Sequence, residues 1–142
     1  MSVRDELLAA GFREAGSIRP NRGGGCDYSI SPDVTGCVVY AHVVGEIVKK
    51  FGTTAPSLRA RVSQNAGTIN QVIALQDGRA RDAAWHHRPF DAFKRLAPEA
   101  IKAGQTIEVW AIESTDADYK TVERHLNAKY NTIGNGWATR LG

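Results

Sequence analysis

Several features that would narrow the function are scarce in this chain of 142 residues. It has only two cysteines, Cys26 and Cys37, which form no C-x-x-C pair and no zinc-ligand spacing, so reduced thiols are favoured over a metal site. No apolar run approaches the roughly 18 residues of a membrane-spanning helix. The charged start of the chain lacks the apolar stretch of a signal peptide. We therefore expect a cytoplasmic protein without a membrane partner.

The common catalytic signatures are also missing. The sequence has no G-x-S-x-G turn, no H-E-x-x-H pair, no dinucleotide-binding fingerprint and no P-loop. His86 and His87 are adjacent, so on a helix or a strand they point in different directions and make poor joint metal ligands. These absences exclude serine hydrolases, zinc proteases and nucleotide-binding enzymes of the usual kinds.

The composition is that of one globular domain with a weak positive charge. Hydrophobic residues make up 42% and charged residues 23%, and 18 basic against 15 acidic side chains give a net charge of +3. The excess lies in the middle of the chain, where residues 46–104 hold ten basic and five acidic side chains. Clustered positive charge is typical of proteins that bind a phosphate backbone, although a lysine-rich solvated face has the same composition.

The chain alternates helical and extended patterns. In order, we expect a helix over 2–11, a Gly/Pro/Arg-rich loop over 17–36, a β-hairpin over 36–53, a helix capped by Thr54 or Ser57, helical pieces over 67–103, a strand over 106–113 and a helix from Thr115 or Asp116. This order predicts an α/β (α+β) fold in which helices flank a small, mostly antiparallel sheet of about three strands. We expect residues 1–35 to form an N-terminal helix and flexible arm, and residues 36–142 to form a catalytic core with a helical insertion at about 67–103.

The hairpin and the helix after it carry an ordered set of motifs. Val38-Val39-Tyr40 lies in the first strand, Lys50-Phe51-Gly52 ends the second, a hydroxyl follows at Thr54, and the helix contains Leu58-x-x-Arg61. This series resembles the GIY-YIG nuclease family, in which a GIY strand, a YIG strand, a hydroxyl residue and an L-x-x-R helix follow one another. Here Val38-Val39 replaces Gly-Ile, and Lys50 replaces the second tyrosine.

The resemblance extends to residue 135 and implies a site. The family has a metal-binding glutamate on a helix after the third strand and an asparagine further on, and Glu123 and Asn135 occupy these places. It implies a catalytic set of Tyr40, Lys50, Arg61, Glu123 and Asn135, with Glu123 holding one divalent ion, Mg²⁺ or Mn²⁺. It also implies DNA as the partner.

The chemistry of these side chains suits phosphodiester hydrolysis. One carboxylate, at Glu123, suits Mg²⁺, which keeps several of its waters. The planar guanidinium of Arg61 grips phosphate oxygens. Tyr40 is a candidate general base if a neighbouring cation such as Lys50 or Arg61 lowers its pKa. Taken singly, each residue also has an ordinary structural explanation, such as strand packing or a solvated helix face.

Further basic and aromatic side chains are candidates for contact with nucleic acid. They are Arg19, Arg22, Lys49, Arg59, Arg79, Arg81, His86, His87 and Arg88, with Trp85, Lys94 and Arg95 close by in the sequence. We expect a metal-dependent DNA endonuclease. Recognition would come from the N-terminal arm, the 67–103 insertion, a homodimer partner or a separate specificity subunit. One alternative is a nucleic-acid-binding module of the same fold with weak or no cleavage, and another is a protein-interaction domain.

Overall fold

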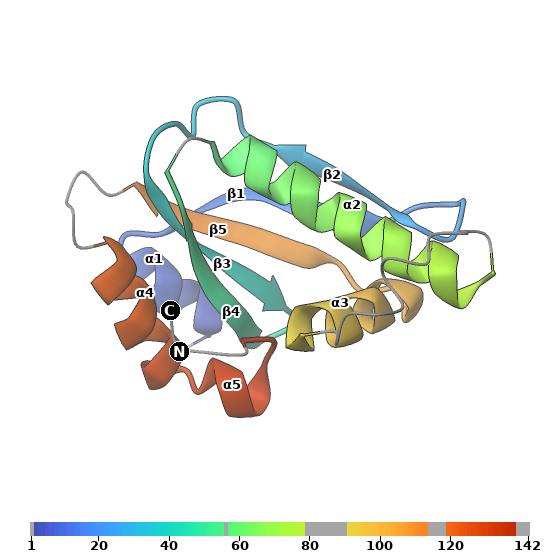
Figure 1. Cartoon of the computed structure of the whole chain (residues 1–142). Helices are drawn as coiled ribbons and strands as arrows, with labels where there is room; N and C mark the ends of the chain where they lie inside the picture. Colours follow the sequence, from blue (N-terminus) through green and yellow to red (C-terminus); the bar gives the residue numbers. More distant parts are fainter. Residues whose placement is uncertain (1, 56, 79–90, 114–118, 139–142) are drawn as a thin grey trace.

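One five-stranded sheet forms the centre of the molecule in the computed structural model, which describes residues 2–55, 57–78, 91–113 and 119–138 (Figure 1). The strands are β1 (Arg13–Pro20), β2 (Cys26–Ile30), β3 (Val38–Val44), β4 (Ile47–Thr54) and β5 (Ile107–Glu113), in the order β2-β1-β5-β3-β4. All neighbouring pairs are antiparallel. The helices are α1 (Val3–Ala9), α2 (Leu58–Gln76), α3 (Ala92–Lys102), α4 (Tyr119–Lys129) and α5 (Thr132–Asn135). None of these helices is long and apolar enough to cross a membrane.

The expectation of about three strands is wrong, because much of the predicted flexible loop over 17–36 belongs to the sheet. It contains the second half of β1 and all of β2, and β1 pairs with both β2 and β5. The Gly-rich turn between them is closed by Asn21, whose side-chain oxygen accepts hydrogen bonds from the N–H groups of Gly23 and Gly25. Only isolated apolar residues such as Ile18, which is fully buried, face the core, so the composition resembles that of a loop. The division of the chain at residue 35 stays a prediction.

The predicted hairpin is confirmed as β3 and β4. Every residue of β3 is buried, because helices cover both faces of the sheet at this strand. Tyr40 belongs to the core beneath α2 and α3, whereas Val39 and Ala41 belong to a second core on the face that carries α1 and α4. This alternation follows from the period of two residues along a strand. By contrast, β4 is an edge strand with one free side.

The helix after the hairpin begins where Ser57 caps it. The Ser57 hydroxyl accepts a hydrogen bond from the N–H of Ala60 at 3.1 Å, which settles the two predicted caps in favour of Ser57. The helix then continues without a break to Gln76. Residue 67, the expected start of a helical insertion, therefore lies inside α2. The later helical piece is confirmed as α3, and residues 79–90 lie outside the described part of the chain.

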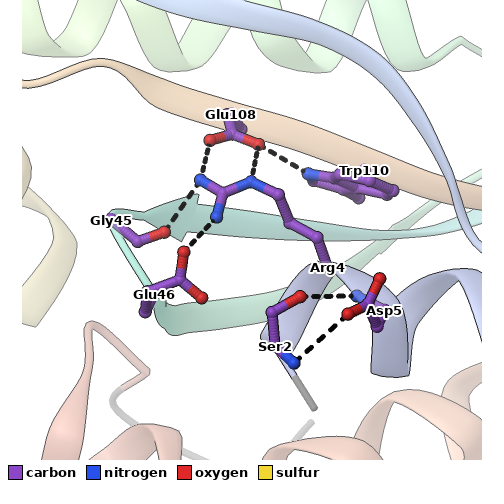
Figure 2. Close-up of polar contacts among 7 residues, drawn as sticks. All are labelled: Ser2, Arg4, Asp5, Gly45, Glu46, Glu108 and Trp110. Carbon is purple, nitrogen blue, oxygen red and sulfur yellow. Dashed lines mark hydrogen bonds and ion pairs between the residues drawn. The ribbon is translucent and has the colours of Figure 1, made fainter.

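A polar cluster fixes α1 on the sheet (Figure 2). The Arg4 guanidinium binds both carboxylate oxygens of Glu108, and it also donates to Glu46 at 2.5 Å and to the carbonyl oxygen of Gly45 at 2.9 Å. The indole N–H of Trp110 donates to Glu108 at 3.1 Å. Arg4 thus ties the first helix to β5 and to the turn of the β3–β4 hairpin.

Candidate active site

A cavity of about 560 Å³ opens at the free side of β4, near the end of the hairpin. It is lined by Tyr40, Lys50, Phe51, Gly52, Thr53, Arg61, Asp91, Lys120, Glu123, Arg124 and Trp137. Because β4 has no neighbouring strand on this side, side chains from α2 on one face of the sheet and from α4 on the other meet around its edge. The cavity therefore brings together residues that lie 83 positions apart in the chain, Tyr40 and Glu123.

Gly52, the glycine of the Lys50-Phe51-Gly52 motif, leaves the space that the ring of Tyr40 occupies. Tyr40 on β3 pairs with Gly52 on β4, and its ring lies directly against the glycine. A Cβ atom at residue 52 would lie 2.5 Å from the tyrosine hydroxyl oxygen. The missing side chain therefore leaves room for the phenol to cross β4 and reach the cavity.

The surroundings of Tyr40 keep its hydroxyl protonated at neutral pH. Burial raises the pKa of Tyr40 above its ordinary value of 10.0, and the Arg61 guanidinium and a hydrogen bond with Asn65 only partly oppose this effect. The Glu123 carboxylate raises the pKa further. The net shift of the Tyr40 pKa is therefore upward, although Arg61 acts in the lowering direction on which its role as general base was conditioned.

A buried histidine lies behind Tyr40. The ring of His42 is 5.3 Å from the ring of Tyr40, and its Nε2 is 3.4 Å from the Asn65 amide nitrogen. Burial, together with the charge of Lys50, lowers the pKa of His42 to about 3, so the imidazole is neutral. Its Nδ1 has no hydrogen-bond partner within the described residues. His42 is therefore an uncharged neighbour of Tyr40 in the core behind the cavity.

Two cations flank the phenol. Lys50 on β4 lines the cavity. Its ammonium group lies 5.7 Å from the centre of the ring of Phe93, on α3, and this cation–π contact stabilises the charge. Arg61 lies one turn into α2, where it is exposed to solvent. The Ser57 cap fixes the start of α2 at Leu58, and this start places Arg61 on the side of the helix that lines the cavity.

The carboxylate of Glu123 enters from the opposite side. It is half-buried, and the Thr53 hydroxyl donates a hydrogen bond to its Oε1 at 3.2 Å. Across residues 2–55, 57–78, 91–113 and 119–138, no group of three or more His, Cys, Asp or Glu side chains could hold a metal ion. Glu123 in a wide cavity, without such a group of ligands around it, fits a hydrated Mg²⁺ or Mn²⁺ ion that keeps most of its waters, and does not fit a closed zinc site.

Sequence reasoning missed three charged residues of the cavity. Lys120 and Arg124 stand one helical turn apart on α4 and flank Glu123, and Asp91 caps α3 by accepting a hydrogen bond from the N–H of Lys94 at 2.9 Å. The i, i+4 spacing of the two cations around Glu123 is a signal that could have identified them. They raise the number of cationic side chains at the cavity to four, against two carboxylates.

Asn135 does not join the other four predicted residues. It lines a neighbouring cavity of about 350 Å³ with Lys49, Glu99 and Trp137, and the Trp137 side chain lines both cavities. After α4 the chain turns back along β4, where the N–H of Trp137 donates to the Lys49 carbonyl oxygen at 2.6 Å. Asn135 therefore lines the smaller cavity and not the larger one, and its catalytic role stays a prediction.

The residues predicted to contact nucleic acid are scattered. None of Arg19, Arg22, Lys49 and Arg59 lines the larger cavity. Arg59 donates to the carbonyl oxygen of Ile30 at 3.1 Å, which gives it a structural partner at the end of β2. The remaining candidates, Arg79, Arg81, His86, His87 and Arg88, lie outside the described residues. Their role stays a prediction.

Two solved structures resemble this chain in fold. A mutant of bacteriophage T4 EndoII has a TM-score of 0.61 and 15% sequence identity over 92% of this chain and 96% of that one. The restriction endonuclease HPY188I in complex with product DNA has a TM-score of 0.50 and 13% identity over 92% of this chain and 82% of that one. The chain has a nuclease-like fold. No family model matches the sequence, and no curated protein sequence matches it.

At 13–15% identity, few of the aligned residues are identical, so the likeness lies in the fold and not in the sequence. The likeness covers the strands and helices that surround the cavity, since it extends over 92% of the chain in both cases. What the chain does at that cavity follows from its own residues.

Proposed function

We propose that this protein is a metal-dependent DNA endonuclease of GIY-YIG type, which hydrolyses phosphodiester bonds at the cavity beside β4. The observation that carries the proposal is the convergence of Tyr40, Lys50, Arg61 and Glu123 on one cavity, as the ordered motifs imply. The fold of the restriction endonuclease bound to product DNA supports a nucleic-acid substrate. The excess of cationic side chains at the cavity supports a polyanionic one.

The residues divide the work of hydrolysis among them. Arg61 and Lys50 bind the non-bridging oxygens of the scissile phosphate and stabilise the charge that builds up as water attacks. Tyr40 lies between them, orients the attacking water and accepts its proton when the phenol is ionised. Glu123 would hold the divalent ion, and that ion supplies Lewis acidity and stabilises the leaving oxygen. Water forms the new bond to phosphorus, and the bond to the leaving oxygen breaks.

A second function is favoured by the high pKa of Tyr40. A phenol that stays protonated at neutral pH is a weak base, so a nucleic-acid-binding module with slow or no cleavage fits the same cavity. Both functions require DNA binding, which a protein-interaction domain does not. A homodimer or a separate specificity subunit is proposed for target recognition in either case.

Plasmid nicking separates these possibilities. Supercoiled DNA is incubated with the wild-type protein and with Glu123→Gln, with Mg²⁺ or with a chelator. We expect wild-type cleavage only with Mg²⁺, and a loss of at least about 100-fold in Glu123→Gln, since even indirect partners of a metal cost up to this much. Glu99→Gln, at an exposed glutamate that does not line the larger cavity, is the matched control and keeps wild-type activity.

The outcomes point to different conclusions. Cleavage that survives Glu123→Gln would refute the proposed site. DNA binding at low salt without cleavage would favour the binding module. No binding of DNA at low salt would refute both nucleic-acid functions.

A further inference from the structure

A buried asparagine closes the free edge of β4 next to the cavity. Asn127 on α4 is 1% exposed, and its side-chain oxygen accepts a hydrogen bond from the N–H of Phe51 at 3.0 Å. Its side-chain nitrogen donates to the carbonyl oxygen of the same residue at 3.2 Å. The carboxamide thus takes the place of a neighbouring strand at Phe51, and it joins α4 to β4 through two hydrogen bonds.

A threonine fixes the orientation of this amide. The hydroxyl of Thr132, which is fully buried, donates to the Asn127 side-chain oxygen at 2.6 Å. Since this oxygen accepts from two donors, the amide cannot turn over without losing both. Asn127 and Thr132 therefore form a rigid unit at the end of α4.

The pair of hydrogen bonds between Asn127 and Phe51, called the clamp below, lies beside Glu123, the candidate metal ligand. Glu123 precedes Asn127 by one helical turn, so both side chains lie on the same side of α4. On β4, Thr53 follows Phe51 by two residues and donates to Glu123 at 3.2 Å. Consequently α4 is held on β4 by polar contacts at two successive positions, one through the backbone of Phe51 and one through Glu123 itself.

The opposite edge of the sheet carries the same device away from the cavity. Asn70 on α2 accepts a hydrogen bond from the N–H of Cys26 at 2.7 Å and donates to its carbonyl oxygen at 3.1 Å. Cys26 lies on β2, the other edge strand. Asn70 does not line the cavity beside β4. Asn70 therefore provides a matched comparison for Asn127.

We propose that Asn127 is a positioning residue for the reaction: its clamp on Phe51 sets the register of α4 against β4, and this register places the Glu123 carboxylate opposite Lys50 and Arg61. The inference rests on the proposed function, because it assigns to Glu123 the role of holding the divalent ion. A displacement of about 1 Å at a reacting group costs about 100-fold in rate. A shift of α4 is therefore expected to lower both kcat and the affinity for the divalent ion.

The test compares Asn127→Asp with Asn70→Asp. Each carboxylate can no longer donate to the strand carbonyl, so both variants lose the same bond at an edge strand. We expect both to lower the midpoint of thermal unfolding by similar amounts. Only Asn127→Asp is expected to weaken Mn²⁺ binding in direct calorimetric titration, and to lower kcat, each by about 10-fold to 100-fold, while KM for DNA stays within about 2-fold.

A milder variant guards against unfolding of Asn127→Asp. Thr132→Val keeps the shape of the side chain but removes the hydroxyl that orients the amide, and we expect an intermediate loss of Mn²⁺ affinity and of kcat. All measurements are made below the unfolding transition of each variant, verified by circular dichroism.

Two results overturn the inference in different ways. If the wild-type protein cleaves DNA and Asn127→Asp and Thr132→Val match Asn70→Asp in Mn²⁺ affinity and kcat, Asn127 has only a structural role and the proposed function stands. If the wild-type protein neither binds Mn²⁺ nor cleaves DNA, the proposed function fails, and the positioning role fails with it.

Discussion

The ring of Tyr40 lies against the backbone of Gly52, its partner on the neighbouring strand, with no room for a side chain between them. A Cβ atom at residue 52 would lie 2.5 Å from both the hydroxyl oxygen and the carbon that bears it. The backbone of Gly52 is not in the left-handed region, so space alone requires the glycine. The position of the phenol in the cavity thus depends on a residue that has no side chain.

Replacing this glycine is therefore expected to damage both the fold and the site. We expect Gly52→Ala to lower the free energy of unfolding by about 1–3 kcal/mol, the usual cost of overpacking, and to reduce cleavage by moving Tyr40. Urea denaturation and plasmid nicking measure the two effects. Gly67→Ala is the control, because a Cβ there meets nothing within 4 Å and α2 gains from the better helix former. Wild-type stability and activity in Gly52→Ala would contradict the packing described here.

The raised pKa of Tyr40 predicts a rate that increases with pH. Below its pKa, the ionised share of the phenol grows tenfold for each pH unit. We expect log kcat/KM to rise with a slope close to 1 between about pH 6.5 and about pH 9, and Tyr40→Phe to lose both the slope and most of the activity. Tyr28→Phe, at a tyrosine on β2 outside the cavity, keeps the wild-type profile. A profile in Tyr40→Phe parallel to that of the wild type would assign the slope to another group.

Lys120 and Arg124 are expected to contact backbone phosphates next to the cleaved one. Each phosphate contact to duplex DNA contributes about 0.9 to the slope of log affinity against log salt concentration. The double variant Lys120→Ala with Arg124→Ala should reduce this slope by about 2, measured by fluorescence anisotropy on a Glu123→Gln background that binds without cutting. Lys129→Ala, on the same helix but outside the cavity, should leave the slope unchanged. An unchanged slope in the double variant would place the DNA elsewhere.

His42 makes the fold sensitive to acid. Its pKa is about 3 in the folded protein, because burial disfavours the charged ring, against about 6.5 in an unfolded chain. Between these values the unfolded chain binds a proton that the native protein does not, so the free energy of unfolding falls as the pH falls, by at most about 1.4 kcal/mol per pH unit. Denaturation at several pH values should show a weaker dependence in His42→Gln. His125→Gln, at an exposed histidine, should follow the wild type.

Local patterns sufficed for the hairpin and for most of the site. The β-branched and aromatic run from Cys37 to Val43 predicts β3. The fixed spacings place Lys50 and Arg61 near Tyr40, because a tight turn joins β3 to β4 and a cap sets the start of the next helix. Glu123 was predicted from the resemblance to the GIY-YIG family, which has a metal-binding glutamate on the helix after the third strand. Four of the five predicted catalytic side chains line one cavity for these reasons.

The strand count and the clamps required tertiary structure. The sequence did not predict the pair of strands β1 and β2, because only single residues of each, such as Ile18 and Cys26, face the core. The bonds that join Asn127 on α4 to Phe51 on β4 were not predicted, because they link residues far apart in the chain.

By itself the sequence determined the hairpin, its following helix and the chemical types of four site residues, since these depend on the chain over short distances. Only the tertiary structure decided how the carboxylate meets the phenol and the cations, and it did so through contacts between distant segments. Asn127 binds a residue 76 positions away and Glu123 one 70 positions away. Such pairs leave no periodic trace in a sequence, because each needs only one polar side chain and a folded sheet edge to receive it.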